Sequence, residues 1–178
     1  MKKITKLLMA AVLFAGFSSS LFAKSLVVFY SLTGTTKELA GRIANEADCD
    51  IFELELKNPY SKNGNTCGEE SKNDKANKVQ REFKAVPDLT KYDTVFIGTP
   101  VWSNDLSNPV ENWILQNQKV LSTKTVVPFC TYWSTGNKEV LAGIGNLSTS
   151  KNVKEGISQA HGEKADVKAW LKKIGEMR

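Results

Sequence analysis

The sequence predicts one α/β domain in which helices cover both faces of an open, five-stranded parallel sheet, a three-layer, doubly wound sandwich. Three observations support this. Short apolar, β-branched runs alternate with helical patterns from Leu26 to the end of the chain. The runs at 26–30, 94–99 and 125–131 are apolar almost throughout, as strands buried on both faces require. No internal repeat or linker divides residues 24–178, so a single domain is expected there.

The first half of this domain begins with a buried strand at Leu26–Tyr30 (LVVFY), followed by a helix at Lys37–Ala47, where apolar residues recur at helical spacing. Ile51–Leu56 (IFELEL) alternates with period two, which indicates a strand nearer the sheet edge. Lys57–Asn77 is rich in Gly, Asn and Ser and is expected to be a loop. It should lead into a helix around Lys78–Phe83.

The second half repeats the alternation. Thr94–Thr99 (TVFIGT) predicts a buried strand, and Pro109–Gln118 a helix with proline in its first turn. Thr125–Thr131 (TVVPFCT) predicts a third buried strand. Because proline removes a ladder donor, Pro128 is expected where this strand loosens near its end. The remaining expected elements are a helix around Lys138–Ile144, a short strand near Val153–Ser158 and a last helix at Glu163–Met177.

The first 23 residues have the layout of a secretory signal peptide. Lys2, Lys3 and Lys6 precede an apolar run of 11 residues, Leu7–Phe17, and the small residues of Ser18–Ala23 offer a cleavage point after Ala23. The run is too short to span a bilayer. We therefore expect a periplasmic or secreted protein without membrane insertion after cleavage. An uncleaved anchor or a buried helix is the alternative.

The charge does not point to nucleic acid. The whole chain carries +5, and loss of the three leader lysines leaves 21 basic against 19 acidic residues, about +2. No basic cluster is interleaved with aromatic residues, so nucleic-acid binding is not expected.

The cysteines and the histidine leave little room for a metal or a catalytic triad. Cys49 and Cys67 flank a strand and a polar loop and could pair in an oxidising compartment, whereas Cys130 lies in an apolar strand. There is no CxxC pair, and His161 is the only histidine. No metal site and no catalytic residue is expected.

The chemistry is expected at the carboxyl ends of the strands, where open parallel sheets bind ligands. The first loop there, Ser31–Thr36 (SLTGTT), joins a strand directly to a helix. Its hydroxyl residues are Ser31, Thr33, Thr35 and Thr36. Together with the amides of the helix start they predict an anion site, and Gly34 permits the tight turn. The alternative is a capping box of Thr35 with Glu38 that binds nothing.

Two further loops carry aromatic residues to the same edge. Gly98–Pro109 presents Trp102 just beyond a strand, either folded back into the core or exposed for a flat cofactor to stack on. Thr131–Gly136 adds Tyr132 and Trp133. Two aromatic loops beside a phosphate loop predict a site for a planar ring with a phosphate tail.

These motifs resemble the flavodoxin-like family, in particular its short, signal-bearing bacterial members. SLTGTT is similar to that family's FMN phosphate loop, Tyr92–Trp102 to its "YDxVFIGxPxWW" strand and ring-stacking loop, and Val126–Thr131 to its third strand. The likeness covers Ser25–Gly175 and implies sheet order 2-1-3-4-5. The chain departs from the family at two places. Ser103 and Asn104 stand where a second Trp and a Gly are usual, and residues 132–134 (YWS) replace a Ser-Gly-Gly run.

The resemblance implies FMN as cofactor and an electron-transfer role outside the cytoplasm, with an unidentified redox protein or small acceptor as partner. Two alternatives stay open: an FMN-dependent oxidoreductase acting on a quinone or similar small acceptor, and a non-redox domain that has lost flavin binding. The residues expected to contact FMN are Ser31, Leu32, Thr33, Gly34, Thr35, Thr36, Thr99, Pro100, Val101, Trp102, Ser103, Thr131, Tyr132, Trp133 and Gly136.

Overall fold

A computed structural model describes residues 24–177 of the chain, so the predicted signal peptide at 1–23 lies outside the described residues. The strands are β1 Ser25–Phe29, β2 Asp50–Glu53, β3 Thr94–Trp102, β4 Asp105–Leu106, β5 Thr125–Tyr132, β6 Asn152–Val153 and β7 Ile157–Ala160. The helices are α1 Thr35–Glu46, α2 Gly64–Ala76, α3 Asn108–Leu121, α4 Asn137–Ser148 and α5 Val167–Ile174, with a 3-10 turn at Leu89–Lys91.

The sheet has the expected order. Its strands run β2-β1-β3-β5-β6 and these neighbours are parallel, which confirms order 2-1-3-4-5. The expected fifth strand is divided in two, because β6 and β7 both pair with β5. The short β4 pairs antiparallel with the end of β3 and is an addition that the sequence did not predict.

The division of the outer strand explains how the sheet accommodates Pro128. This residue lies in the middle of β5, so its expected place near the end of the strand was wrong. β6 pairs with residues 125–126 and β7 with residues 129–132, and Pro128 falls between them. Gly156, in the connection from β6 to β7, passes so close that a Cβ there would lie 2.6 Å from the Pro128 carbonyl oxygen. The missing proline amide therefore faces a break in the neighbouring strand.

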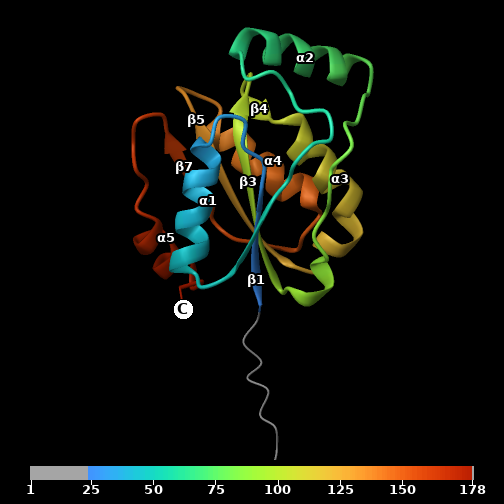
Figure 1. Cartoon of the computed structure of the whole chain (residues 1–178). Helices are drawn as coiled ribbons and strands as arrows, with labels where there is room; N and C mark the ends of the chain where they lie inside the picture. Colours follow the sequence, from blue (N-terminus) through green and yellow to red (C-terminus); the bar gives the residue numbers. More distant parts are fainter. Residues whose placement is uncertain (1–23, 178) are drawn as a thin grey trace, which may run out of the picture.

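Both faces of the sheet are covered, as Figure 1 shows. Along β1, Leu26 and Val28 enter one core cluster, and Val27 and Phe29 enter the other. The first cluster contains the apolar residues of α3 and α4, and the second those of α1 and α5. This alternation on a strand buried on both sides gives the three-layer sandwich.

The region between β2 and β3 differs from the prediction. The expected loop at 57–77 contains helix α2, and the expected helix at 78–83 is absent. The side chain of Asn63 caps α2 by accepting hydrogen bonds from the amides of Asn65 and Thr66. Phe83 instead forms an antiparallel bridge with Leu56. In Figure 1, α2 lies above the end of the sheet at which the parallel strands finish.

The cysteines lie on different faces of the sheet. Cys67 is buried in the cluster with α3 and α4, whereas Cys49 packs against the cluster with α1 and α5. Between residues 24 and 177 no disulfide is formed, so the suggested pairing of Cys49 with Cys67 does not occur.

Candidate functional site

The first loop is organised around the hydroxyl of Ser31. Its Oγ accepts hydrogen bonds from the amide of Gly34 at 3.1 Å and from the amide of Lys37 at 3.3 Å. Gly34 precedes α1 with φ of 97°, a left-handed conformation that favours glycine. Thr35 is thus the first helical residue, so the capping box of Thr35 with Glu38 is not formed.

The hydroxyls of this loop divide into two groups. Thr33 is exposed, and its Oγ1 lies 3.4 Å from that of Thr35. Thr36 is buried, and its Oγ1 shares a hydrogen bond of 2.8 Å with Oγ1 of Thr131 at the end of β5. Thr36 therefore joins the first loop to the third instead of facing the loop opening.

The start of α1 fits a phosphate group. The first amides of a helix lack partners within it, and the helix dipole places partial positive charge at this end. The Ser31 hydroxyl occupies the amides of Gly34 and Lys37, so those of Thr35 and Thr36 are the helix-start donors left for an anion. A Cβ at Gly34 would meet nothing within 4 Å, so the space beside this turn is open. An anion approaching this loop meets backbone donors without a steric barrier.

The second loop is a hairpin instead of an irregular segment. Ser103 and Asn104 form its two-residue turn, with φ of 51° and 63°, as a type I′ turn requires. Asn tolerates this conformation. This explains why Asn104 can take the position at which the family that the sequence resembles usually has a glycine. At the base, Thr99 is buried and its Oγ1 shares a 2.8 Å hydrogen bond with Oγ of Ser107, so this hydroxyl serves the hairpin.

Trp102 is half-buried and folded against two tyrosines. Its ring meets Tyr30 edge-on, with centroids 5.7 Å apart, and meets Tyr60 in the same way at 5.1 Å. Both tyrosines belong to the core cluster that contains α3 and α4. Of the two placements that the sequence left open, the structure shows the folded one.

The third loop contacts the tip of the hairpin. Thr135 donates a hydrogen bond to Oδ1 of Asn104 at 2.7 Å. Gly136 has φ of 86° and packs so closely that a Cβ would lie 2.7 Å from Cα of Asn104. With the bond between Thr36 and Thr131, these contacts bring all three predicted loops together. Pro100, Val101 and Tyr132 are half-buried in the last residues of β3 and β5.

Trp133 does not join this group. Its side chain is 75% exposed and stacks on His161, with ring centroids 3.8 Å apart and an angle of 21° between the planes. In this arrangement it connects the third loop to the residue that follows β7.

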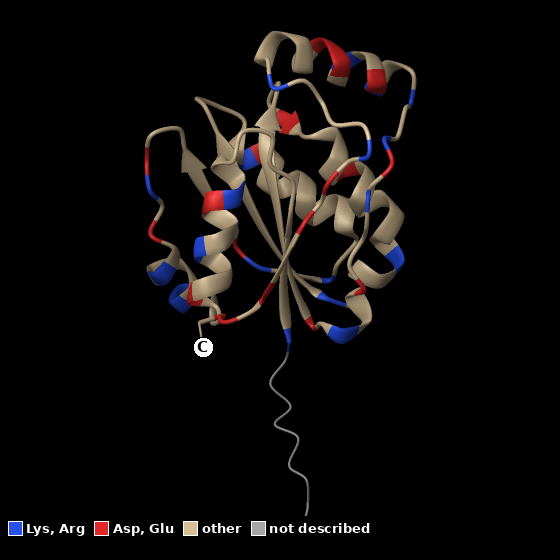
Figure 2. Cartoon of the chain, in the orientation of Figure 1, with Lys and Arg blue, Asp and Glu red and all other residues tan. Residues whose placement is uncertain are grey.

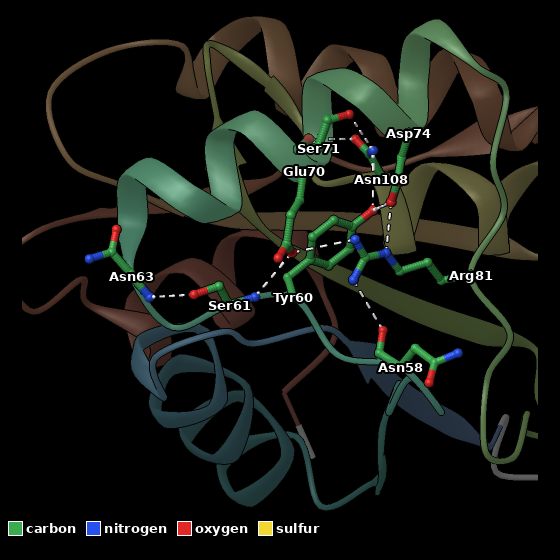
Figure 3. Close-up of polar contacts among 9 residues, drawn as sticks. All are labelled: Asn58, Tyr60, Ser61, Asn63, Glu70, Ser71, Asp74, Arg81 and Asn108. Carbon is green, nitrogen blue, oxygen red and sulfur yellow. Dashed lines mark hydrogen bonds and ion pairs between the residues drawn. The ribbon is translucent and has the colours of Figure 1, made fainter.

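A polar cluster that sequence reasoning missed surrounds Tyr60, the tyrosine whose ring meets Trp102; Figure 3 shows its members. The Tyr60 hydroxyl donates to Oδ2 of Asp74 at 2.7 Å, and Nε of Arg81 donates to the same oxygen at 2.7 Å. The Arg81 guanidinium carbon also lies 3.6 Å from the centre of the Tyr60 ring. Burial, and next the hydrogen bond to Asp74, raise the pKa of Tyr60 well above its usual range. The cluster therefore connects Tyr60, the residue that Trp102 contacts, to Asp74 of α2.

The same cluster attaches α2 to α3. Asn108, at the start of α3, accepts a hydrogen bond from Ser71 at 3.0 Å and donates to the Tyr60 hydroxyl at 3.3 Å. Glu70 accepts from the amide of Ser61 at 3.1 Å. Because Cys67 is the one apolar residue that α2 buries, these polar contacts supply most of its attachment.

An open cavity of about 770 Å³ adjoins the phosphate-loop side of the site. It lies between the first loop and the chain that leaves β2. The lining residues are Tyr30, Ser31, Leu32, Thr33, Gly34, Glu53, Leu54, Glu55, Leu56, Lys57, Pro59, Tyr60, Lys62 and Lys84. None of the residues expected from the second and third loops lines it, so it is an additional space beside the predicted ring site.

Charges of both signs are distributed over the helices and the connecting segments, whereas strands β1, β3, β5, β6 and β7 carry none (Figure 2). Over residues 24–177, no helix is long and apolar enough to cross a membrane. In the same part of the chain, no group of three or more His, Cys, Asp or Glu side chains is placed to hold a metal ion.

Comparison with known proteins agrees with this architecture. Residues 24–174 match the sequence profile of the family described as flavodoxin. A candidate flavoprotein from Bacteroides eggerthii is 26% identical, with a TM-score of 0.71 over 86% of this chain and 98% of that chain. A flavoprotein from Lactobacillus acidophilus, solved in complex with FMN, is 22% identical, with a TM-score of 0.70 over 86% of this chain and 99% of that chain. A flavodoxin from the domain Archaea is 15% identical, with a TM-score of 0.54 over 86% and 94%. No curated protein shows significant similarity to the sequence.

Proposed function

The chain belongs to the flavodoxin family, and from this premise we propose that it binds FMN by its phosphate at residues 31–36 and transfers electrons outside the cytoplasm. The observation that supports this most directly is the loop organised by Ser31. Its hydroxyl fixes the amides of Gly34 and Lys37 at the start of α1. These two bonds shape the turn and leave the amides of Thr35 and Thr36, in the first turn of α1, as the backbone donors for a phosphate, so that no basic side chain is required.

The remaining loops would shape the ring end of the site. The buried bond from Thr36 to Thr131 sets the spacing between phosphate loop and third loop, and the bond from Thr135 to Asn104 sets the position of the hairpin. Trp102 stands at the edge of this region, supported by Tyr60. When bound, FMN supplies the redox chemistry, and the protein provides binding, orientation and electrostatics.

The location and the partner follow from the leader at residues 1–23, whose layout supports export to the periplasm or the medium. The partner would be a redox protein or a small acceptor in the same compartment. Amino-terminal sequencing of the protein from a periplasmic or culture fraction tests this. A start at Lys24 is expected, and recovery of the intact leader in the cytoplasmic fraction would contradict export.

Flavin binding is tested by titrating the protein from Lys24 onward with FMN and with riboflavin, which lacks the phosphate, while following tryptophan fluorescence. Ser31→Ala should weaken FMN binding by about tenfold, because hydrogen bonds to charged groups contribute about 1.5–3 kcal/mol. Riboflavin binding should be unchanged. Ser122→Ala, at the end of α3 where the hydroxyl bonds to Lys119, is the matched control. Absence of quenching at micromolar FMN would refute the proposal.

A further inference from the structure

We propose that Glu53 is a positioning residue of the phosphate site. It holds the ammonium group of Lys37 away from the phosphate, so that phosphate binding depends on backbone amides and is weaker than the chain could otherwise achieve. The inference rests on the proposed function, since it assumes that a flavin phosphate binds at residues 31–36. It adds a role for an ion pair at the rim of that loop.

Lys37 lies where a cation can approach the phosphate. It is the third residue of α1 and directly follows Thr35 and Thr36, whose amides are the donors left for an anion. Its own amide donates to Oγ of Ser31 in the phosphate loop. Side chains of an α-helix tilt towards its amino-terminal end, so the stem of Lys37 leaves the helix towards the anion site. A free lysine here can add a charge-assisted hydrogen bond to those of the amides.

Glu53 is placed beside the same loop by the neighbouring strand. It is the last residue of β2 and pairs in register with Phe29 of β1, two residues before Ser31. Glu53 also lines the open cavity that residues 31–34 line. A carboxylate at this place has the wrong sign for an anion site, so its presence needs an explanation other than direct phosphate binding.

The two side chains form an ion pair. Nζ of Lys37 donates to Oε2 of Glu53 at 2.6 Å. This hydrogen bond, and next the negative charge of Glu53, raise the pKa of Lys37 above its ordinary value, so the lysine is charged and paired at neutral pH. The side chain of Lys37 is 63% exposed and that of Glu53 only 25%. The lysine stem is therefore the partner that is free to move once the carboxylate is removed.

A second ion pair of the same cavity provides the matched control. Glu55 lines the cavity and pairs with Lys84 at 2.7 Å. Neither residue belongs to α1 or to the phosphate loop. Glu55→Gln therefore removes one negative charge from the cavity wall, as Glu53→Gln does, but it does not release Lys37.

The test compares the dissociation constants of FMN and riboflavin, measured by tryptophan fluorescence with the protein from Lys24 onward. Glu53→Gln should tighten FMN binding by roughly five- to tenfold, because the freed ammonium gains a pair with the phosphate and one like charge is removed. Riboflavin, which lacks the phosphate, should bind this variant and the wild type equally. Glu55→Gln should change FMN affinity by less than about twofold. Added salt should reduce the gain, because the charge of an exposed lysine is screened.

Replacement of Lys37 shows whether the gain comes from this lysine. Lys37→Gln in the wild-type background should weaken FMN binding by no more than about twofold, because the lysine is paired with Glu53 there. In the Glu53→Gln background the same replacement should weaken FMN binding by about fivefold or more. Equal effects of Lys37→Gln in the two backgrounds would show that the pair acts only through its net charge, and would refute the withholding of Lys37.

The outcomes separate this inference from the proposed function. If the wild type binds FMN and Glu53→Gln binds it equally or more weakly, the role of Glu53 is refuted while the proposed function stands. If no variant binds FMN, the proposed function fails and this inference fails with it. Urea unfolding checks the fold of each variant, and the midpoints should agree because exposed ion pairs contribute little to stability. Glu53→Ala makes the same charge change with a different side chain and should show the same gain.

Discussion

Replacing Thr131 with valine removes one partner of the buried hydroxyl pair that joins the first and third loops. In the wild type, Oγ1 of Thr36 and Oγ1 of Thr131 lie 2.8 Å apart, and both residues are almost fully buried. Valine has nearly the same shape and is compatible with a strand, so Thr131→Val should change little except this bond. The Thr36 hydroxyl is then buried without a partner.

An unsatisfied buried hydroxyl costs about 1–3 kcal/mol, whereas exchanging both partners for apolar groups of the same shape is close to neutral. Each single variant, Thr131→Val or Thr36→Val, should therefore lose about 2 kcal/mol of unfolding free energy. In a domain of this size that lowers Tm by roughly 4–8 °C. The double variant should lie within about 1 kcal/mol of the wild type, which gives a coupling energy of about 3 kcal/mol or more.

Urea unfolding of the four proteins, followed by tryptophan fluorescence, measures this cycle. Losses that add in the double variant would refute the idea that the hydroxyls stabilise the fold through each other. FMN titration of the double variant supplies the functional control. Its affinity should stay within about threefold of the wild type, because neither hydroxyl faces the loop opening. A folded double variant that no longer binds FMN would show that one of these hydroxyls, or the loop spacing that their bond sets, is needed for binding.

Three further perturbations test other parts of the structure. A Cβ at Gly98 would lie 2.0 Å from the Phe129 ring, so Gly98→Ala should lower the unfolding free energy by about 1–3 kcal/mol. Urea titration measures this change. An unchanged urea midpoint would show that Gly98 and Phe129 do not pack this closely. Burial raises the pKa of Cys130 from 9.0 to about 12, so a thiol reagent at pH 8 should label this residue only in the unfolded protein. Because the native pKa is the higher one, stability should also fall as the pH rises from about 9 towards 12. Asp74→Asn weakens the bond that connects α2 to Arg81. Amide exchange in residues 64–76 should then accelerate at least about tenfold while the amides of the sheet stay protected. Uniform acceleration over the whole domain would show that α2 does not open separately.

The sheet could be predicted from the sequence because its central strands are buried on both faces. A run such as Leu26–Tyr30 has one interpretation once helical patterns flank it. Helix α2 could not be predicted in this way, because its sequence has no apolar face and its attachment depends on distant polar residues such as Tyr60 and Arg81. The one local signal was Asn63, whose side chain caps the helix.

The site shows the same division between local and distant causes. The phosphate loop was predicted from adjacent residues, since the donors of a helix start are fixed by local backbone geometry. The placement of Thr36 depends on Thr131, 95 positions away, and the sequence offers no sign of that contact. Likewise, Trp102 was recognised, but its folded orientation depends on Tyr60, a residue of the presumed loop. The turn at Ser103 and Asn104 had a signal, because Asn readily adopts positive φ.

The divided outer strand of the sheet affects how copies of the chain meet one another. A long, uninterrupted edge presents a row of unpaired amides and carbonyls on which another molecule can add a strand. Here β6 has two residues and β7 has four, and the break between them lies opposite Pro128. The outer edge therefore offers no continuous template, which protects a crowded population of these molecules against sheet-to-sheet aggregation.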